Sequence, residues 1–168
     1  MSPARADIVN AVELAGRAAE LDRELDLSQL PRLKEAGALP GTRAMARLAF
    51  GLFEHKPTIE VRIGGSIVML CQRCMRPCRS EVDETDSLMV VPTDREEVAG
   101  GFEPCVAEPD HLSVPAIIEE QMLLAMPLVP MHADLSECRA PVDTGRAGDE
   151  EKQRPFANLR DLLDKPRQ

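Results

Sequence analysis

The chain has 168 residues and a formal net charge of −9, and it combines 43% hydrophobic residues with no Trp, no Tyr and four Phe. A chain of this length and composition can bury the core of a single domain, which excludes global disorder. Its few aromatic side chains also argue against a protein that stacks single-stranded bases on aromatic platforms.

The charge is distributed unevenly along the chain. Residues 1–79 carry 12 basic and 9 acidic side chains, whereas residues 80–120 carry 12 acidic side chains and one basic side chain, Arg95. Residues 121–168 carry 7 basic and 8 acidic side chains. An acidic middle section repels phosphate and attracts basic proteins, although the same charges could equally form a solvated face that keeps the protein soluble.

No apolar run approaches the ~20 residues that span a membrane, and none has the pattern of a signal peptide. Without a secretory signal, the five cysteines are expected to bind metal or to stay free in a reducing compartment. We therefore expect a cytoplasmic protein that has no membrane partner.

The N-terminal part of the sequence predicts two helices. Residues 8–24 place apolar side chains at helical spacing, among them Ile8, Val12 and Ala15. Ser28 is the expected N-cap of a second, short helix that ends before Gly37.

The middle of the sequence predicts an antiparallel sheet, because apolar and polar side chains alternate over residues 42–91. Strands are expected at residues 42–52, 59–63, 67–70, 82–91 and, as a weaker candidate, 102–107. Gly64 and Gly65 are expected to form a two-residue hairpin turn.

Ser113 is the expected N-cap of the clearest helix, residues 114–126, which Pro127 ends. Glu119 and Glu120 flank its apolar stripe; paired carboxylates could serve acid–base chemistry, but we expect both on the exposed face of the helix. The fold class is therefore α+β: an antiparallel sheet, open or barrel-like, with one main packed helix and an N-terminal helix.

The whole chain, residues 1–168, is expected to form a single domain. Residues 140–154 are polar and rich in Gly, Asp and Glu, which predicts a flexible linker. Apolar side chains return in residues 155–163, which include Phe156 and Leu159. We expect this last segment to dock, either onto the core of its own chain or onto a partner.

Cys71-Gln-Arg-Cys74, called here the knuckle, is the most informative motif. Two thiols separated by two residues can close on one soft metal ion or form a redox pair. His132 and Cys138 could complete a tetrahedral zinc site, although 57 residues separate Cys74 from His132. Two further cysteines, Cys78 and Cys105, are interpreted as small buried or incidental residues.

Charged side chains surround and follow the knuckle. The basic ones could touch RNA phosphates, and the acidic ones could bind a basic protein. The candidate contact residues are Arg73, Arg76, Arg79, Glu81, Asp83, Glu84, Asp86 and, in the C-terminal segment, Phe156.

These segments, in this order, resemble the YceD family, the large ribosomal RNA subunit accumulation proteins. The resemblance covers about residues 59–163. It rests on Cys71-Gln-Arg-Cys74 with Pro77, Phe102-Glu103-Pro104, Glu119-Glu120, Pro127-Leu128-Val129-Pro130-Met131-His132, Cys138, and Pro155-Phe156-Ala157 with Leu159.

The resemblance implies a non-enzymatic role in the accumulation or processing of large-subunit ribosomal RNA during ribosome assembly. The implied partners are a large-subunit ribosomal protein or a ribosomal RNA precursor, because genes of this family commonly lie beside that of a small basic large-subunit ribosomal protein. Many members of the family outside the proteobacterial type carry a second Cys-x2-Cys at the positions of Val129 and His132. Since Val129 cannot ligate a metal, zinc would depend here on His132 and Cys138.

The alternative function is a zinc- or thiol-dependent enzyme that uses Cys71 and Cys74. A redox knuckle should open a helix, whose dipole lowers the pKa of a thiol, whereas this knuckle follows a predicted strand. The sequence shows no Ser-His-Asp set and no phosphate-binding glycine loop. We therefore assign no catalytic residue and expect no small-molecule substrate.

Overall fold

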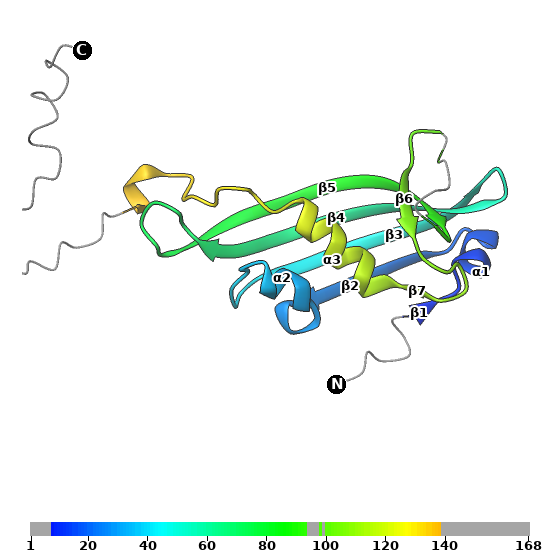
Figure 1. Cartoon of the computed structure of the whole chain (residues 1–168), viewed down its shortest axis with the longest axis horizontal. Coiled ribbons are helices and arrows are strands. Elements are labelled where there is room, and N and C mark those ends of the chain that lie inside the picture. The colour runs from blue at the N-terminus through cyan, green and yellow to red at the C-terminus, as the bar shows by residue number, and fades with distance from the viewer. Residues whose placement is uncertain (1–7, 94–97, 99, 139–168) are drawn as a thin grey trace, which may run out of the picture.

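A computed structural model of the protein describes residues 8–93, 98 and 100–138. Its main element is a five-stranded sheet in the order β2-β3-β4-β5-β6 (Figure 1). The strands are β2 (Glu20–Asp26), β3 (Arg43–Phe53), β4 (Lys56–Leu70), β5 (Pro77–Val91) and β6 (Glu103–Val106). Neighbours from β2 to β5 are antiparallel, and β6 is parallel to β5. The predicted α+β class is confirmed; in the described part of the chain the sheet is open, not barrel-like, and only β6 departs from the antiparallel arrangement.

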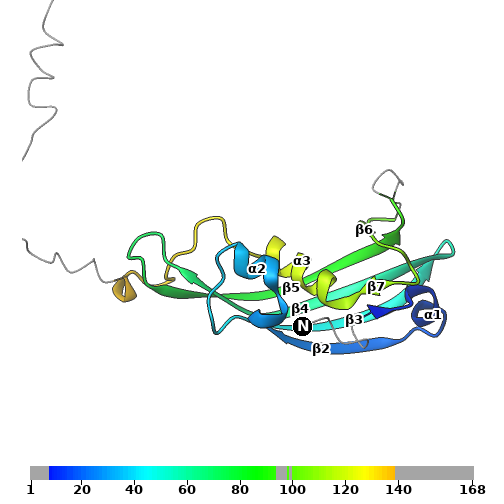
Figure 2. The ribbon, with the colours of Figure 1, turned by 60° about the horizontal axis from the view of Figure 1, so that its bottom comes forward.

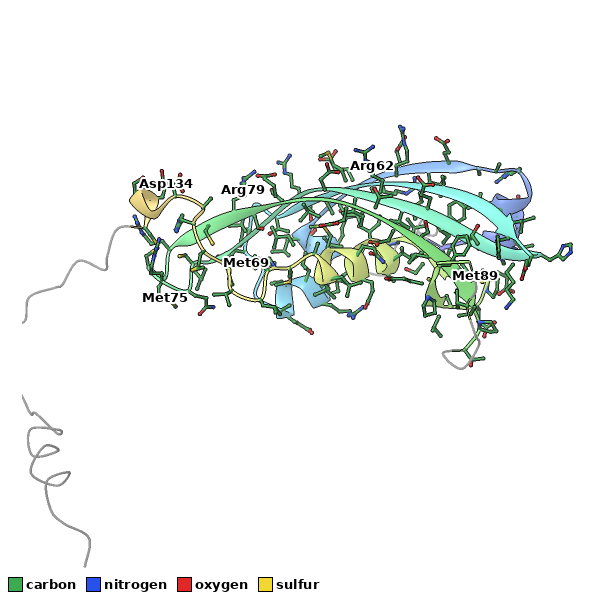
Figure 3. All side chains as sticks on the ribbon, turned by 90° about the horizontal axis from the view of Figure 1, so that it is seen from above. Arg62, Met69, Met75, Arg79, Met89 and Asp134 are labelled. Carbon is green, nitrogen blue, oxygen red and sulfur yellow. The ribbon has the colours of Figure 1, made fainter. Side chains whose placement is uncertain are left out.

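Short helices lie on one side of this sheet. The helical elements are α1 (Ala11–Gly16), the 3-10 turn η2 (Leu27–Gln29), α2 (Pro31–Glu35), α3 (Val114–Leu124) and the 3-10 turn η3 (Leu135–Glu137); β1 (Ile8–Val9) and β7 (Leu112–Ser113) form a separate two-stranded sheet. Figure 2 shows α2 and α3 on the same side of the sheet. Figure 3 shows that this side is concave, and that Arg62 and Arg79 lie on the convex side, which no described element covers.

The core fills the space between the concave face and α3. Leu48 of β3 and Val61 and Ile63 of β4 are buried there together with Ile118 and Met122 of α3. Successive side chains of a strand point to opposite faces, and the apolar side chains of α3 recur at helical spacing, so both patterns bring these side chains to one interface. The strands predicted at residues 42–52 and 102–107 are therefore confirmed as β3 and β6.

The predicted turn at Gly64 and Gly65 is wrong, because β4 continues through both residues. The chain turns instead at Glu54 and His55, whose φ values of 49° and 68° suit the tight turn of a twisted hairpin. Gly65 has a φ of 138°, and a Cβ atom there would lie 2.2 Å from the carbonyl oxygen of Arg43. Glycine is thus required at this position for the close approach of β3 and β4 and not for a turn.

The helix predicted over residues 8–24 is also wrong in its extent. Asn10 caps α1 by accepting a hydrogen bond from the N–H of Glu13 at 3.0 Å, but α1 ends at Gly16. Residues 20–26 form β2, in which Leu21 and Leu25 alternate with acidic side chains. Pairing of β2 with β3 therefore overrides a weak helical pattern.

The short helix predicted before Gly37 is confirmed as α2, but its predicted cap, Ser28, is not the residue that caps it. The residue before α2 is Leu30, which offers no side-chain cap. The carboxylate of Glu119 supplies one from α3, because its Oε1 accepts a hydrogen bond from the N–H of Leu33 at 3.1 Å. Glu119 is therefore buried, and the expectation that it lies on the exposed face of α3 is wrong.

The helix predicted from Ser113 is confirmed as α3. The Ser113 hydroxyl accepts a hydrogen bond from the N–H of Ala116 at 3.4 Å. Glu120, on the exposed side of α3, pairs with Arg32 of α2 at 2.6 Å. The predicted linker at residues 140–154 and the docking segment at residues 155–163, with Phe156, lie outside the described residues. Among the helices that the structure describes, none has the length and apolar character that a membrane crossing requires.

Candidate functional site

Four of the predicted site residues meet at one end of the sheet. The ligand atoms of Cys71, Cys74, His132 and Cys138 all lie within 4.8 Å of one another. Two of the separations are 3.5 Å, between the sulfurs of Cys71 and Cys138, and 3.6 Å, between the Cys74 sulfur and Nδ1 of His132. A tetrahedral zinc ion with Zn–S bonds of about 2.3 Å separates its sulfur ligands by about 3.8 Å. Three sulfurs and one imidazole nitrogen at these spacings could therefore hold zinc.

The knuckle, residues 71–74, owes its shape to the turn between β4 and β5. The N–H of Cys71 donates to the carbonyl of Arg76 at 2.8 Å, and the N–H of Met75 donates to the carbonyl of Cys71 at 2.9 Å. Met75 reaches this turn with a φ of 55°, in the left-handed region. The turn directs both sulfurs inward, since Cys71 and Cys74 are buried while Met75 is exposed.

The other two donors arrive on the segment that follows α3. The N–H of Gln72 donates to the carbonyl of Pro130 at 2.9 Å and joins this segment to the knuckle. Nε2 of His132 lies 3.1 Å from the carbonyl oxygen of Pro77. A carbonyl can only accept, so Nε2 carries the proton and Nδ1 is left free to face Cys74 as a ligand. The turn η3 then leads to Cys138.

Two of the three candidate arginines stabilise this centre. Nε of Arg73 donates to the sulfur of Cys138 at 3.0 Å, and the guanidinium of Arg76 donates to the carbonyl of Glu137 at 2.5 Å. Figure 3 shows the turn at Met75 and the η3 region at the same end of the molecule. Arg79 lies apart from both, exposed on the convex face of β5. The structure therefore does not gather the three arginines into one free basic surface.

The electrostatics of the centre favour the thiolate of Cys71 over that of Cys138. Burial disfavours the charged form of Cys71, but backbone N–H groups of the knuckle and of His132 surround its sulfur and lower its pKa to about 5. Burial raises the pKa of Cys138, even though the guanidinium of Arg73 acts in the opposite direction. A metal cation would remove this difference by holding every thiol as a thiolate.

The remaining cysteines are not ligands of this centre. Cys78 is buried beside Cys71 and Cys74, as expected for a small core residue, and burial raises the pKa of its thiol. Cys105 of β6 is half-buried against the main core, and burial raises its pKa as well. Both thiols are therefore expected to stay protonated near neutral pH.

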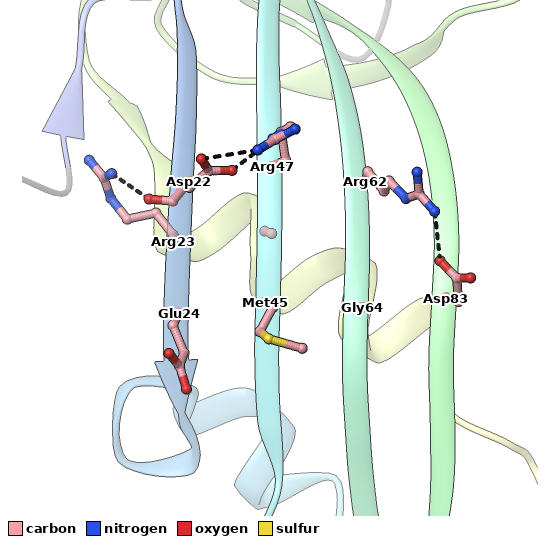
Figure 4. Close-up of a pocket in the computed structure, with 9 residues that line it drawn as sticks. Asp22, Arg23, Glu24, Met45, Arg47, Arg62, Gly64 and Asp83 are labelled. Carbon is pink, nitrogen blue, oxygen red and sulfur yellow. Dashed lines mark hydrogen bonds and ion pairs between the residues drawn. The ribbon is translucent and has the colours of Figure 1, made fainter.

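The four candidate acids of β5 do not form one surface. Alternation along the strand places Glu81 and Asp83 on the convex face and Glu84 and Asp86 on the concave face. On the convex face Asp83 pairs with Arg62 at 3.7 Å, so part of its charge is balanced (Figure 4).

The capping role of Glu119 is the feature that sequence reasoning missed. Its only signal is indirect: Leu30, at the start of α2, cannot cap a helix, so the cap has to come from elsewhere in the fold.

Comparison with known protein families gives a match over the part of the chain that contains the candidate metal centre. The family model described as "Large ribosomal RNA subunit accumulation protein YceD" matches residues 59–163. This range includes all four donors of the candidate metal centre, together with β5, β6 and α3. No solved structure matches the chain. Since the match covers well over half of the sequence, the protein belongs to the YceD family of large ribosomal RNA subunit accumulation proteins.

Proposed function

We propose that the protein supports the accumulation and processing of large-subunit ribosomal RNA in the cytoplasm as a non-enzymatic assembly factor. It does so by binding a basic large-subunit ribosomal protein through the acidic strand β5. The observation that carries this proposal is the charge of residues 80–120, 12 acidic side chains against one basic side chain, within a chain of this family. Such a surface attracts a basic protein at long range and keeps it soluble until its RNA site is available.

A structural role for the Cys3His group agrees with a non-enzymatic protein. With Cys71, Cys74, His132 and Cys138 as ligands, a zinc ion would have all four tetrahedral positions filled by protein. Catalytic zinc keeps one position open for water or substrate. The bound metal would join the turn after β4 to the segment after α3 and so stabilise the fold by cross-linking distant parts of the chain.

Contact with protein is favoured over contact with RNA. Affinity for RNA increases with the number of phosphates that basic side chains neutralise. Arg73 and Arg76 already donate to the metal centre, which leaves Arg79 as the candidate arginine that projects away from it. One candidate arginine within an acidic strand supplies little affinity for a polyanion.

Affinity capture from growing cells tests the proposal. Tagged protein should recover a basic large-subunit ribosomal protein at moderate salt, and this recovery should survive treatment with ribonuclease. Changing Glu81, Asp83, Glu84 and Asp86 to Lys should reduce recovery strongly, whereas Arg79→Ala should leave most of it. Recovery that disappears with ribonuclease, or that depends on Arg79 more than on the acids, would identify an RNA-binding protein and refute the proposal. Recovery of metabolic enzymes alone would refute the assembly role.

A further inference from the structure

One long edge of the sheet has no neighbouring strand in the described part of the chain. β6 pairs only with residues 88–91 of β5, so residues 77–87 have β4 on one side and no strand on the other. In Figure 1 this stretch forms the upper edge of the sheet between β6 and the segment that follows α3.

The hairpin turn determines which backbone groups of β5 point to this edge. The N–H of Cys71 donates to the carbonyl of Arg76, so these two residues form a hydrogen-bonded pair, and such pairs alternate along an antiparallel ladder. The residues that direct their N–H and C=O groups toward β4 are therefore 78, 80, 82, 84 and 86. The residues that direct both groups away from β4 are 79, 81, 83, 85 and 87. Of this second set, Ser87 directs its C=O to the N–H of Glu103 in β6, whereas residues 79, 81, 83 and 85 have no strand beside them in the described part of the chain.

The acidic side chains lie on both sides of this edge. Glu81 and Asp83 project from the convex face, and Glu84 and Asp86 project from the concave face. A partner that lies on one face of the sheet can contact only one of these pairs. A strand added at the edge contacts both, because its own side chains alternate between the two faces.

We propose that the free edge of β5, from Arg79 to Thr85, binds an extended peptide segment rich in Lys or Arg as an additional β-strand. The inference rests on the proposed function and names the form in which the basic partner binds. Main-chain hydrogen bonds to residues 79–85 hold the segment, and its basic side chains pair with the acids of both faces. A second copy of β5 is not the occupant, because its acids would face those of the first copy across the new strand pair.

At the opposite edge of the sheet, β2, charged side chains make contacts within the protein. The guanidinium of Arg23 donates to the carbonyl oxygen of Asp22 at 2.9 Å. The carboxylate of Asp22 pairs with Arg47 at 2.8 Å (Figure 4), and Asp26 caps η2. Asp22 and Asp26 are thus engaged within the protein, and the exposed Glu20 and Glu24 offer control positions on this second edge.

Thr85 allows the edge to be blocked without a change in charge. Its N–H points away from β4, so proline at this position removes one donor of the free edge and leaves the ladder with β4 intact. The probe is a fluorescent nine-residue peptide of alternating Lys and Thr, added to the full-length protein at low salt. We expect Thr85→Pro to weaken binding about tenfold or more, since it removes a hydrogen bond and adds a steric block. Thr85→Val should bind like the wild type.

Charge and backbone pairing are separated by two further comparisons. A variant with Glu81→Lys and Glu84→Lys changes one acid on each face of β5 and should lose peptide binding. A control variant with Glu20→Lys and Glu24→Lys on β2 has the same change in charge and should retain peptide binding. A peptide with N-methyl groups on two adjacent central residues keeps its charge but loses hydrogen bonding at both edges, and it should bind wild-type protein at least about tenfold more weakly.

Equal binding of the methylated and unmethylated peptides would overturn the proposal. So would undiminished binding by a Thr85→Pro protein that melts like the wild type, or equal losses from the β5 and β2 double variants. If Thr85→Pro does not fold, the methylated peptide alone decides the question with wild-type protein. Intact peptide binding without capture of a ribosomal protein from cells would remove the proposed function and leave the edge site in place.

Discussion

Removal of one ligand from the candidate metal centre is the most informative perturbation, because the centre joins segments that are far apart in the sequence. Between Cys74 and His132 lie 57 residues. A covalent cross-link that closes a loop of this size lowers the entropy of the unfolded chain by an amount worth about 4 kcal/mol. A zinc ion held by both halves acts as such a cross-link as long as it stays bound.

Cys138→Ser should therefore lower the free energy of unfolding by about 4 kcal/mol, which corresponds to a fall in Tm on the order of 10 °C for a domain of this size. The assay is thermal unfolding of protein purified without chelator, together with elemental analysis for zinc. The wild type should contain about one zinc per chain and should lose the same stability when a strong chelator removes it. The variant should contain less zinc and respond little to the chelator.

Cys105→Ser is the matched control, because Cys105 lies in β6 and is not part of the Cys3His group. It should keep both the zinc and the response to the chelator. Wild-type protein without zinc, whose Tm changes neither with chelator nor with Cys138→Ser, would refute the reasoning. A zinc-containing wild type whose stability is unaffected by chelator would show that the cross-link adds nothing to the fold.

Three further predictions, two of them with a control substitution, test the fold by urea denaturation. Gly65→Ala should lower the free energy of unfolding by at least about 3 kcal/mol, because the added Cβ meets the backbone of β3 at a φ that L-residues rarely adopt. Its control is Gly64→Ala, whose Cβ has no atom nearer than 3.9 Å and which should stay within about 1 kcal/mol. Equal urea midpoints for the two variants would refute the close approach of the strands. Glu119→Ala should lower the free energy of unfolding by about 2 kcal/mol, because it leaves a buried N–H of α2 without an acceptor. Glu120→Ala removes only an exposed ion pair and should lower it by less than about 1 kcal/mol. A larger loss of stability from Glu120→Ala than from Glu119→Ala would contradict the capping role. Met75→Gly should raise stability by up to about 1 kcal/mol, because glycine adopts the left-handed conformation of this turn without strain, and an unchanged or lower midpoint would count against that geometry.

The sequence by itself determined the elements whose pattern is local and strong. Alternation predicts β3 correctly and helical spacing predicts α3 correctly, because each pattern shows which side chains of one segment face the core. The four candidate metal ligands, Cys71, Cys74, His132 and Cys138, could also be identified from the sequence, since such residues are few and chemically distinctive. The imbalance of charge over residues 80–120 needed only counting.

Long-range pairing decided what the local pattern could not. Residues 20–26 became β2 because β3 offered a free edge, which outweighed a weak helical spacing. Gly65 looked like a turn residue, but whether a glycine turns the chain or admits a neighbouring strand depends on what lies beside it in space. Glu119 was expected in solvent because its neighbour, the uncapped start of α2, is 86 residues away in the sequence.

Only the tertiary structure placed the candidate sites. The convergence of the four donors depends on how the segment after α3 returns to the turn between β4 and β5, and a spacing of 57 residues carries no information about that path. The tertiary structure also placed the acids of β5 on opposite faces and left the strand without a neighbour along residues 77–87. Residue type determines what a side chain can bind, whereas strand pairing determines which side chains and backbone groups a partner can reach at the same time.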